Sequence, residues 1–313
     1  MARKVSSLEE QLDRLAELRG QAPSPEGWAE AAKALGSKMN LVAAKAARII
    51  GEWGEQRGAE LMPELVAAFD RFMVKPEAGD KRCAAKIEIL KALCKLQYPS
   101  PSLFRRAMRH IQMEPSWGGP VDTAAEVRAL GAMGLAQTDY TEVQEEIVPL
   151  LFDTERDTRI GAVRAIAVAG LPGGALLLRV KALGGDDPEV LGECFAALLR
   201  VEPAKSLEFV AKFLEHGDAA IAEAAALALG DSRMEAAFAV LRDAFDRSHA
   251  MPVRRTLLVA LALLRRESAI DYLVDLVRDG AQQASADALE ALAMYEKDPN
   301  LKERIEGALQ HRG

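Results

Sequence analysis

Aromatic side chains and long apolar runs are both scarce in this sequence. Only 5% of its 313 residues are aromatic, although half are apolar. A compact enzyme fills a deep core with large side chains, so this composition favours thin layers of closely packed small residues. No window approaches the roughly 18 uncharged apolar residues that a membrane-spanning helix requires. The first residues also lack the apolar segment of a signal peptide, and we therefore expect a cytoplasmic protein without a membrane partner.

Residues that perform catalysis or bind metals are scarce as well. The cysteines are odd in number, lie in apolar helical contexts and have no Cys-x-x-Cys spacing, which predicts buried, reduced thiols at Cys83, Cys94 and Cys194. No two histidines have a metal-binding spacing; they are His110, His216, His249 and His311. There is no Gly-x-Ser-x-Gly motif for a nucleophilic serine. We expect a non-enzymatic protein with no catalytic residue, no cofactor and no metal.

Charge is unevenly distributed along the chain. The net charge of −7 argues against broad binding to nucleic acid or to anionic membranes. Residues 75–115 nevertheless carry nine Lys and Arg against four Asp and Glu, whereas residues 116–313 carry 21 against 32. The sequence therefore predicts one basic region followed by an acidic second half.

What the sequence does contain is a short tripeptide of the type small–aliphatic–small, which recurs eight times at a nearly fixed spacing. Its copies begin at Ile49, Ala92, Ala129, Ala165, Ala197, Ala228, Ala260 and Ala291. Successive copies lie 43, 37, 36, 32, 31, 32 and 31 residues apart. Periods in this range indicate stacked supersecondary units. The small residues would let neighbouring helices approach to about 8 Å, the short end of the usual range.

The fifth copy shows how one unit is built. Asp187-Pro188 begins a helix, because aspartate caps free N–H groups and proline fits the first turn. Glu202-Pro203 breaks that helix. A second helix follows from about Lys205 to His216, and Gly217 is expected to end it in a left-handed conformation. Each unit is thus a helical hairpin of about 31 residues.

The same pattern predicts seven more second helices. They are Leu61–Met73, Leu103–Ile111, Glu142–Phe152, Ala175–Leu183, Glu235–Phe245, Ala269–Val277 and Leu301–Leu309. No run of alternating or β-branched residues predicts a strand. We expect an all-α, right-handed α-α superhelix, a single solenoid over 1–313. Its parts are an N-terminal cap (1–38), eight hairpins (39–299) and a C-terminal capping helix (300–313) that closes the last hairpin.

These repeats resemble bacterial HEAT-like repeats, including the short type found in phycobilin lyase subunits. The resemblance rests on the opening aspartate, a partial Val253-Arg254 pair, Ala-Leu-Gly and a leucine-rich second helix, and it covers about residues 40–300. It implies a solenoid but no single function, because such repeats occur in adaptors, lyases, a metal hydroxylase and DNA glycosylases. Hydroxylases of the deoxyhypusine type bind iron through repeated His-Glu pairs, which this sequence lacks.

One predicted second helix, Leu103–Ile111, is basic. It displays Arg105, Arg106, Arg109 and His110, with Lys81, Arg82 and Lys86 nearby in sequence. Spacings of three and four place Arg105 or Arg106 on one face with Arg109. If second helices line the concave surface, as HEAT-like stacking implies, these cations point into a groove. They then either pair with acids, such as Glu114 or those of the next repeat, or bind an acidic peptide, a phosphate or nucleic acid.

The three tryptophans are Trp28, Trp53 and Trp117. Trp53 is predicted to be core, and Trp28 to pack the N-terminal cap onto the first repeat. Trp117 lies in the longest irregular insertion, where it either contacts a partner or folds back over its own repeats.

Together, these patterns predict a scaffold that binds an unidentified protein partner through the concave face of the solenoid. The expected contact residues are Arg105, Arg106, Arg109, His110 and Trp117. The alternatives are a nucleic-acid-binding protein, a HEAT-like DNA glycosylase or a prosthetic-group lyase. Nucleic acid is the less favoured partner because of the negative net charge.

Overall fold

A computed structural model describes residues 7–54, 57–170 and 172–312. The expectation for the first residues of the chain lies outside this range. Contacts between Cα atoms divide the chain into two compact units, unit 1 (1–171) and unit 2 (172–313). Each unit is described by itself below, and the single solenoid over 1–313 stays a prediction.

Unit 1 consists of helices and one short strand pair. Its α-helices are α1 (Ser7–Arg19), α2 (Pro25–Leu35), α3 (Asn40–Trp53), α4 (Met62–Val74), α5 (Pro76–Gly79), α6 (Ala84–Lys95), α7 (Pro101–Met108), α8 (Ala125–Ala136), α9 (Val143–Ile147) and α10 (Arg156–Ala169). Its 3-10 helices are η1 (Gly58–Leu61), η2 (Lys81–Cys83) and η3 (Val148–Phe152), and its strands are β1 (Met113–Glu114) and β2 (Val121–Asp122).

The described part of unit 2 consists of helices joined by turns and short loops. Its α-helices are α11 (Gly174–Gly184), α12 (Pro188–Val201), α13 (Pro203–Ala211), α14 (Ala219–Asp231), α15 (Ala237–Arg247), α16 (Met251–Leu263), α17 (Glu267–Asp279), α18 (Gln282–Leu292) and α19 (Pro299–Arg312). Its 3-10 helices are η4 (Lys212–Glu215) and η5 (Ala293–Tyr295). The all-α repeat architecture expected from the tripeptide is confirmed.

The tripeptides lie where neighbouring helices touch. They occur in α3, α6, α8, α10, α12, α14, α16 and at the end of α18, and within each unit successive members of this series pack against each other. The contacts are tight: a Cβ added at Gly51 would lie 3.0 Å from the Cα atom of Ala92, and one at Gly230 would lie 2.4 Å from the carbonyl oxygen of Ala260. Small residues are therefore needed at these crossings.

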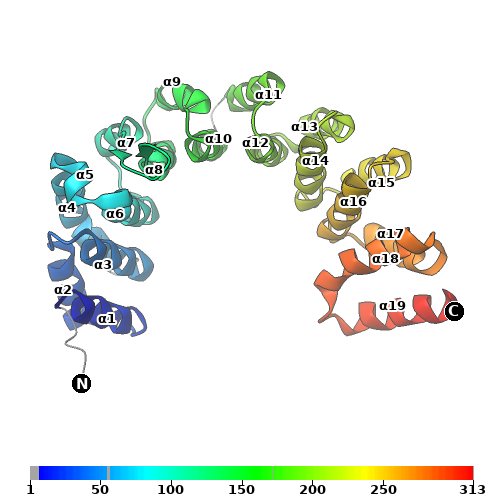
Figure 1. Ribbon diagram of the computed structural model, residues 1–313, viewed down its shortest axis with the longest axis horizontal. Helices are drawn as coiled ribbons and strands as arrows, with labels where there is room; N and C mark the ends of the chain where they lie inside the picture. The colour runs from blue at the N-terminus through cyan, green and yellow to red at the C-terminus, as the bar shows by residue number, and fades with distance from the viewer. Residues whose placement is uncertain (1–6, 55–56, 171, 313) are drawn as a thin grey trace. The chain divides into compact units, whose positions relative to one another are not determined.

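In unit 1 the tripeptide helices form the inner row of the curve, and α4, α7 and α9 form the outer row (Figure 1). Successive outer helices make few contacts with one another. Alanine and glycine draw the inner helices together, whereas the outer helices contribute larger side chains such as Phe69 and Phe104. The expectation that second helices line the concave surface is therefore wrong for unit 1.

The turns differ in detail from their predicted chemistry. Gly217 does not take a left-handed conformation; the turn before α14 is closed by Asp218, whose Oδ1 accepts from the Ala220 N–H at 2.9 Å. Four turns that follow a tripeptide helix instead contain a residue with positive φ, at Gln97, Gly170, Arg233 and Arg265.

Two predictions about buried groups can be compared directly with the structure. Trp28 is buried and packs edge-on against Trp53, with ring centroids 5.2 Å apart, so the cap meets the first repeat as expected. Cys83 and Cys194 are buried and Cys94 is half-buried, and none forms a disulfide. Burial raises the pKa of Cys83 to about 11 and the pKa of Cys94 and Cys194 to about 12. None of the described helices is both long and apolar enough to cross a bilayer.

Candidate partner-binding surface

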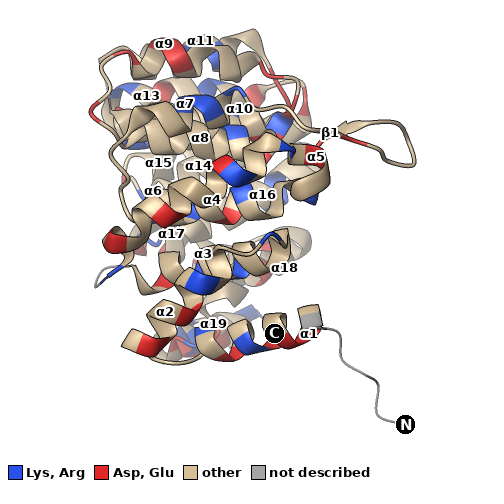
Figure 2. Cartoon of the chain, turned by 90° about the vertical axis from the view of Figure 1, so that its left-hand side faces the viewer, with Lys and Arg blue, Asp and Glu red and all other residues tan. Residues whose placement is uncertain are grey.

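The insertion around Trp117 is a β-hairpin, not an irregular loop. Met113 pairs with Asp122 and Glu114 with Val121 in an antiparallel arrangement. Strands of two residues are too short to show an alternating pattern, so these strands could not be predicted. Figure 2 shows this hairpin extending beyond the helices beside α5.

The hairpin carries apolar side chains into solvent. Trp117 lies in the turn that joins the strands, and its relative exposure is 106%. Ile111, Met113 and Val121 are also exposed, at 65%, 44% and 47%. Trp117 therefore does not fold back over its own repeats.

The base of the hairpin is anchored by a buried polar network centred on Gln112. Its Nε2 donates to the carbonyl oxygen of Asp80 at 2.9 Å and to Oε1 of Glu114 at 2.6 Å. Its Oε1 accepts from Nζ of Lys86 at 2.8 Å. Both polar atoms of the Gln112 side chain are thus hydrogen-bonded. These bonds fix Gln112, which directly precedes β1, in place.

Asp80 and Lys86 form the deepest part of this network. Both side chains are completely buried, with Nζ of Lys86 3.3 Å from Oδ2 of Asp80. The same carboxylate accepts from the backbone N–H groups of Ala85 and Lys86 at 2.9 and 3.0 Å, and from Nδ2 of Asn40 at 3.1 Å. Since Asn40 begins α3 and Ala85 lies in α6, Asp80 also joins two successive repeats.

The second strand is held by Arg128 of α8. Its guanidinium donates to Asp122 at 2.6 Å, to Asp153 at 2.8 and 2.9 Å, and to the carbonyl oxygen of His110 at 2.9 Å. Burial raises the pKa of Asp122, but hydrogen bonds from the Ala124 and Gln112 N–H groups and from Arg128 outweigh it, so the pKa lies below its usual value. Asp122 is therefore held in its charged form.

His110 belongs to this network rather than to an exposed helix face. The helix α7 ends at Met108, and the chain then turns inward, so that His110 is only 8% exposed. Its Nε2 lies 3.2 Å from Oε1 of Gln112. Burial lowers its pKa, the hydrogen bond to Gln112 partly opposes this, and the charge of Lys86 adds to the lowering. The prediction that His110 is displayed for a partner is wrong, and Lys86 likewise is buried rather than part of a basic surface.

The three arginines of the basic helix pair with acids of neighbouring repeats. Nε of Arg105 and Nη2 of Arg109 each lie 2.8 Å from the carboxylate of Glu146 in α9. Nη2 of Arg106 lies 2.8 Å from Oδ1 of Asp70 in α4. Burial raises the pKa of Glu146, but Arg105 and Arg109 together bring it below its usual value. Glu114, named as a possible partner, instead accepts from the backbone N–H of Arg82 at 2.6 Å.

The positive charge of these arginines is therefore offset by neighbouring carboxylates. A groove of about 360 Å³ beside Arg109 is lined by three carboxylates; its lining residues are Met108, Arg109, Glu142, Glu145, Glu146, Pro149 and Leu150. These pairs link α4, α7 and α9 across the outer row of unit 1. The arginines contribute to stacking between repeats and leave little positive charge for a phosphate backbone.

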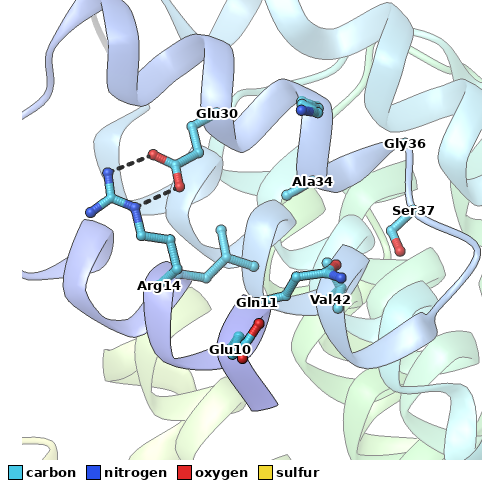
Figure 3. A pocket seen from close by; sticks show the side chains of 10 residues that line it. Glu10, Gln11, Arg14, Glu30, Ala34, Gly36, Ser37 and Val42 are labelled. Atoms are coloured by element: carbon cyan, nitrogen blue, oxygen red, sulfur yellow. Dashed lines mark hydrogen bonds and ion pairs between the residues drawn. The ribbon is translucent and has the colours of Figure 1, made fainter. Parts of the chain in front are cut away.

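A second groove lies in the N-terminal cap between α1 and α2 (Figure 3). Its volume is about 640 Å³, and Arg14 and Glu30 pair along its edge at 2.8 and 3.0 Å. It contains no cysteine or histidine. Among the described residues, no group of three or more His, Cys, Asp or Glu is placed to hold a metal ion.

The buried network was not expected from the sequence, yet a sequence signal for it exists. An aspartate and a basic residue six positions later precede three successive tripeptides, as Asp80 and Lys86, Asp122 and Arg128, and Asp153 and Arg159. The structure joins each pair, in the third case through the Asp153 carbonyl oxygen, which accepts from Arg159 at 2.9 Å.

Comparison with known families identifies the repeat type. A family model described as HEAT repeats matches residues 176–262, from α11 to α16. No curated protein sequence matches the chain. The helices from α11 to α16 are therefore HEAT-like repeats.

Several solved structures are similar to the chain over most of its length. One is the complex of CpcE and CpcF of phycocyanin lyase from Nostoc sp. PCC7120, at 14% identity and a TM-score of 0.38, covering 100% of both chains. Human deoxyhypusine hydroxylase in complex with glycerol has 18% identity and a TM-score of 0.30, with 94% of this chain and 92% of that chain covered. An engineered protein has 20% identity and a TM-score of 0.38, with 97% and 90% covered. Likeness at this level says nothing about function.

Proposed function

We propose that this protein is a non-enzymatic scaffold that binds a protein partner through the β1–β2 hairpin of unit 1. The observation that carries the proposal is the full exposure of Trp117 on a hairpin whose base is fixed by buried hydrogen bonds. A tryptophan side chain buries on the order of 200 Å² when covered, and tryptophan is enriched among the residues that dominate binding energy.

Rigidity at the base strengthens this interpretation. Ordering a mobile loop on binding costs conformational entropy, whereas an anchored hairpin has already lost it. The anchor uses side chains on both sides of the hairpin, with Gln112 before β1 and Asp122 in β2. Trp117 is thus presented at a fixed position, with Ile111, Met113 and Val121 as apolar neighbours along the same hairpin.

We favour the hairpin over the concave inner row of unit 1, because the charges there are paired between repeats. Arg19 binds Glu52 at 2.6 Å, and Arg48 binds Glu88 at 2.8 Å. Lys91 completes the series with Glu126 at 2.8 Å. A partner on the inner row would have to compete with these pairs, whereas Trp117 has no contact to give up.

The test is affinity capture from a lysate with wild type, Trp117→Ala and Leu183→Ala, followed by mass spectrometry. Leu183 is the matched control, an exposed apolar residue of α11 at 71% exposure. We expect a protein to be captured by the wild type and by Leu183→Ala but lost from Trp117→Ala, with unchanged melting temperatures. Retention of every captured protein by Trp117→Ala would contradict the hairpin as the contact.

A further variant, Arg105/Arg106/Arg109→Glu, separates this proposal from the nucleic-acid alternative. Because these arginines already pair with Glu146 and Asp70, we expect the variant to be less stable but to lose no nucleic acid. Binding of the wild type to short duplex DNA should stay flat at about 50 mM salt, where phosphate contacts are strongest. A saturable isotherm under these conditions would favour nucleic-acid binding instead.

A further inference from the structure

We propose that three arginines along one edge of unit 2 bind an extended acidic segment of a protein partner. These edge arginines are Arg200, Arg233 and Arg265. The proposal rests on the scaffold function proposed above, and it names a second surface together with the chemistry that this surface recognises.

The edge arginines lie at or just after the C-terminal ends of three successive tripeptide helices of unit 2, α12, α14 and α16. Arg200 is in the last turn of α12, Arg233 follows α14, and Arg265 follows α16. A cavity of about 150 Å³ beside Arg200 is lined also by Asp231 and Ser232, so the ends of α12 and α14 are neighbours. The segments after α14 and α16 are joined by a hydrogen bond of 2.8 Å from Nε of Arg266 to the carbonyl oxygen of Arg233.

The edge arginines differ from the other arginines of unit 2 in having no partner for their guanidinium groups. Nine of its twelve arginines hydrogen-bond or ion-pair through the guanidinium: Arg179, Arg242, Arg247, Arg254, Arg255, Arg266, Arg278, Arg304 and Arg312. Among the described residues of the unit, the three that do not are the edge arginines, and all three are exposed. Asp231 shares the cavity with Arg200 but forms no ion pair with it.

The backbone at two of these positions is one that favours glycine. Arg233 and Arg265 both have φ of 53°, in the left-handed region where a Cβ atom is strained. The turn after α10 uses Gly170 there, with φ of 58°. A cation near a helix C-terminus interacts favourably with the helix dipole, but this does not require a left-handed residue. Arg200 lies near the C-terminus of α12 with an ordinary helical backbone. Arginine in the strained conformation at two consecutive repeats therefore points to a role for its side chain.

The spacing of the edge arginines indicates what they bind. Neighbouring inner helices lie about 8–10 Å apart, which an extended chain spans in about three residues at roughly 3.3 Å each. One guanidinium per repeat suits a series of carboxylates at this interval, whereas a single phosphate is bound best by guanidinium groups that converge on one point.

The experiment measures fluorescence anisotropy of a labelled synthetic peptide with glutamate at every third position, separated by glycine and serine. Its lysine counterpart and a single-stranded oligodeoxynucleotide are the comparison probes. The variant is Arg233→Gly/Arg265→Gly in the full chain. We expect the wild type to bind the glutamate peptide. The variant should bind it at least about tenfold more weakly, because two charge-assisted contacts are lost.

Stability provides an independent readout, because the same variant should raise the melting temperature by relieving the left-handed strain. Gln97→Gly is the matched control: it relieves the same strain at φ of 52° in unit 1 and should leave peptide binding unchanged. Equal binding by wild type and double variant, absence of binding by the wild type, or tighter binding of the oligodeoxynucleotide would each overturn the proposal. Trp117→Ala should not alter peptide binding, so failure here and failure of the hairpin proposal are distinguishable.

Discussion

The repeats of unit 1 and unit 2 share one plan but differ in spacing and in what they bury between helices. Tripeptides within unit 1 are 36 to 43 residues apart, whereas those within unit 2 are 31 or 32 apart. Six residues after the aspartates that open repeats, unit 1 has Lys86 and Arg128, and unit 2 has Gly192 and Ala224. The basic residues of unit 1 hold the inserted β-hairpin, whereas the described residues of unit 2 contain no strand.

This difference shows how a repeat accepts an insertion. A regular repeat needs only small residues where helices cross, and its turns close through local bonds such as the cap at Asp218. A buried ion pair also occurs in unit 2, between Lys181 and Asp186, but it joins the end of α11 to the turn before α12. In unit 1 the buried charges reach across repeats, so the insertion becomes part of the stack.

The largest effect is expected from removing the buried carboxylate. Asp80→Ala leaves the ammonium of Lys86 buried without its partner, which should lower the free energy of unfolding by about 3–5 kcal/mol. Asp218→Ala, the matched change at an exposed cap in unit 2, should cost only about 1 kcal/mol. Urea denaturation of both variants checks the contrast, and equal losses would contradict it.

A second effect should be the same in both units, because both use small residues at the inner crossings. A Cβ added at Gly161 would lie 2.3 Å from the Cβ of Ala129, and one added at Gly230 would lie 2.4 Å from the carbonyl oxygen of Ala260. Substitution of either glycine by alanine should therefore cost about 1–3 kcal/mol through overpacking, despite the better helix propensity of alanine.

Gly307 of α19 is the matched control for these glycines, because a Cβ there meets no atom within 4 Å. Gly307→Ala should stabilise the chain by up to about 1 kcal/mol. Thermal melts of the three variants measure the signs. A stabilising effect at Gly161 or Gly230 would show that the inner row is looser than described.

Much of the fold could be predicted because the repeating signals are local. Pro188 begins α12 as expected, since proline and aspartate act within one helical turn. Pro203 follows the end of α12 as expected, but α13 begins at Pro203 itself rather than at about Lys205. The site could not be predicted in the same way. Strands of two residues have no period, and His110 is buried because α7 ends one turn earlier than its sequence pattern suggested. The direction of curvature depends on the relative bulk of two rows of helices, which no single repeat reveals.

A smaller effect, confined to unit 1, should follow pH. An unfolded histidine has a pKa of about 6.5, and burial lowers the pKa of His110 in the folded state. The unfolded chain therefore binds the proton more readily, and stability should fall as pH drops below about 6.5 toward the lower pKa of the folded state. Asp122 favours the protonated form, whereas Lys86 and Arg128 oppose it.

The check is urea denaturation of wild type and His110→Phe across this range of pH. The variant should lose the part of the pH dependence that lies between the two pKa values of the histidine. An identical pH profile in wild type and variant would exclude His110 as the titrating group.

The smallest effect is expected on the outer row. Arg106 and Asp70 are each about half exposed, and exposed pairs contribute about 0–1 kcal/mol. Arg106→Gln should therefore change stability by about 1 kcal/mol or less, with the difference shrinking as salt rises. Thermal melts at low and high salt measure it. A larger loss would mean that the outer row stabilises unit 1 as strongly as its buried network does.

The central claim is that the anchored hairpin of unit 1 is where a partner binds. It is tested most directly by placing a photo-crosslinking amino acid at position 117 and, in a second protein, at position 183, with irradiation in the native lysate. We expect one protein species to be crosslinked through position 117 and to be absent from the position 183 sample. Absence of any crosslink at position 117, or the same products from both positions, would contradict it.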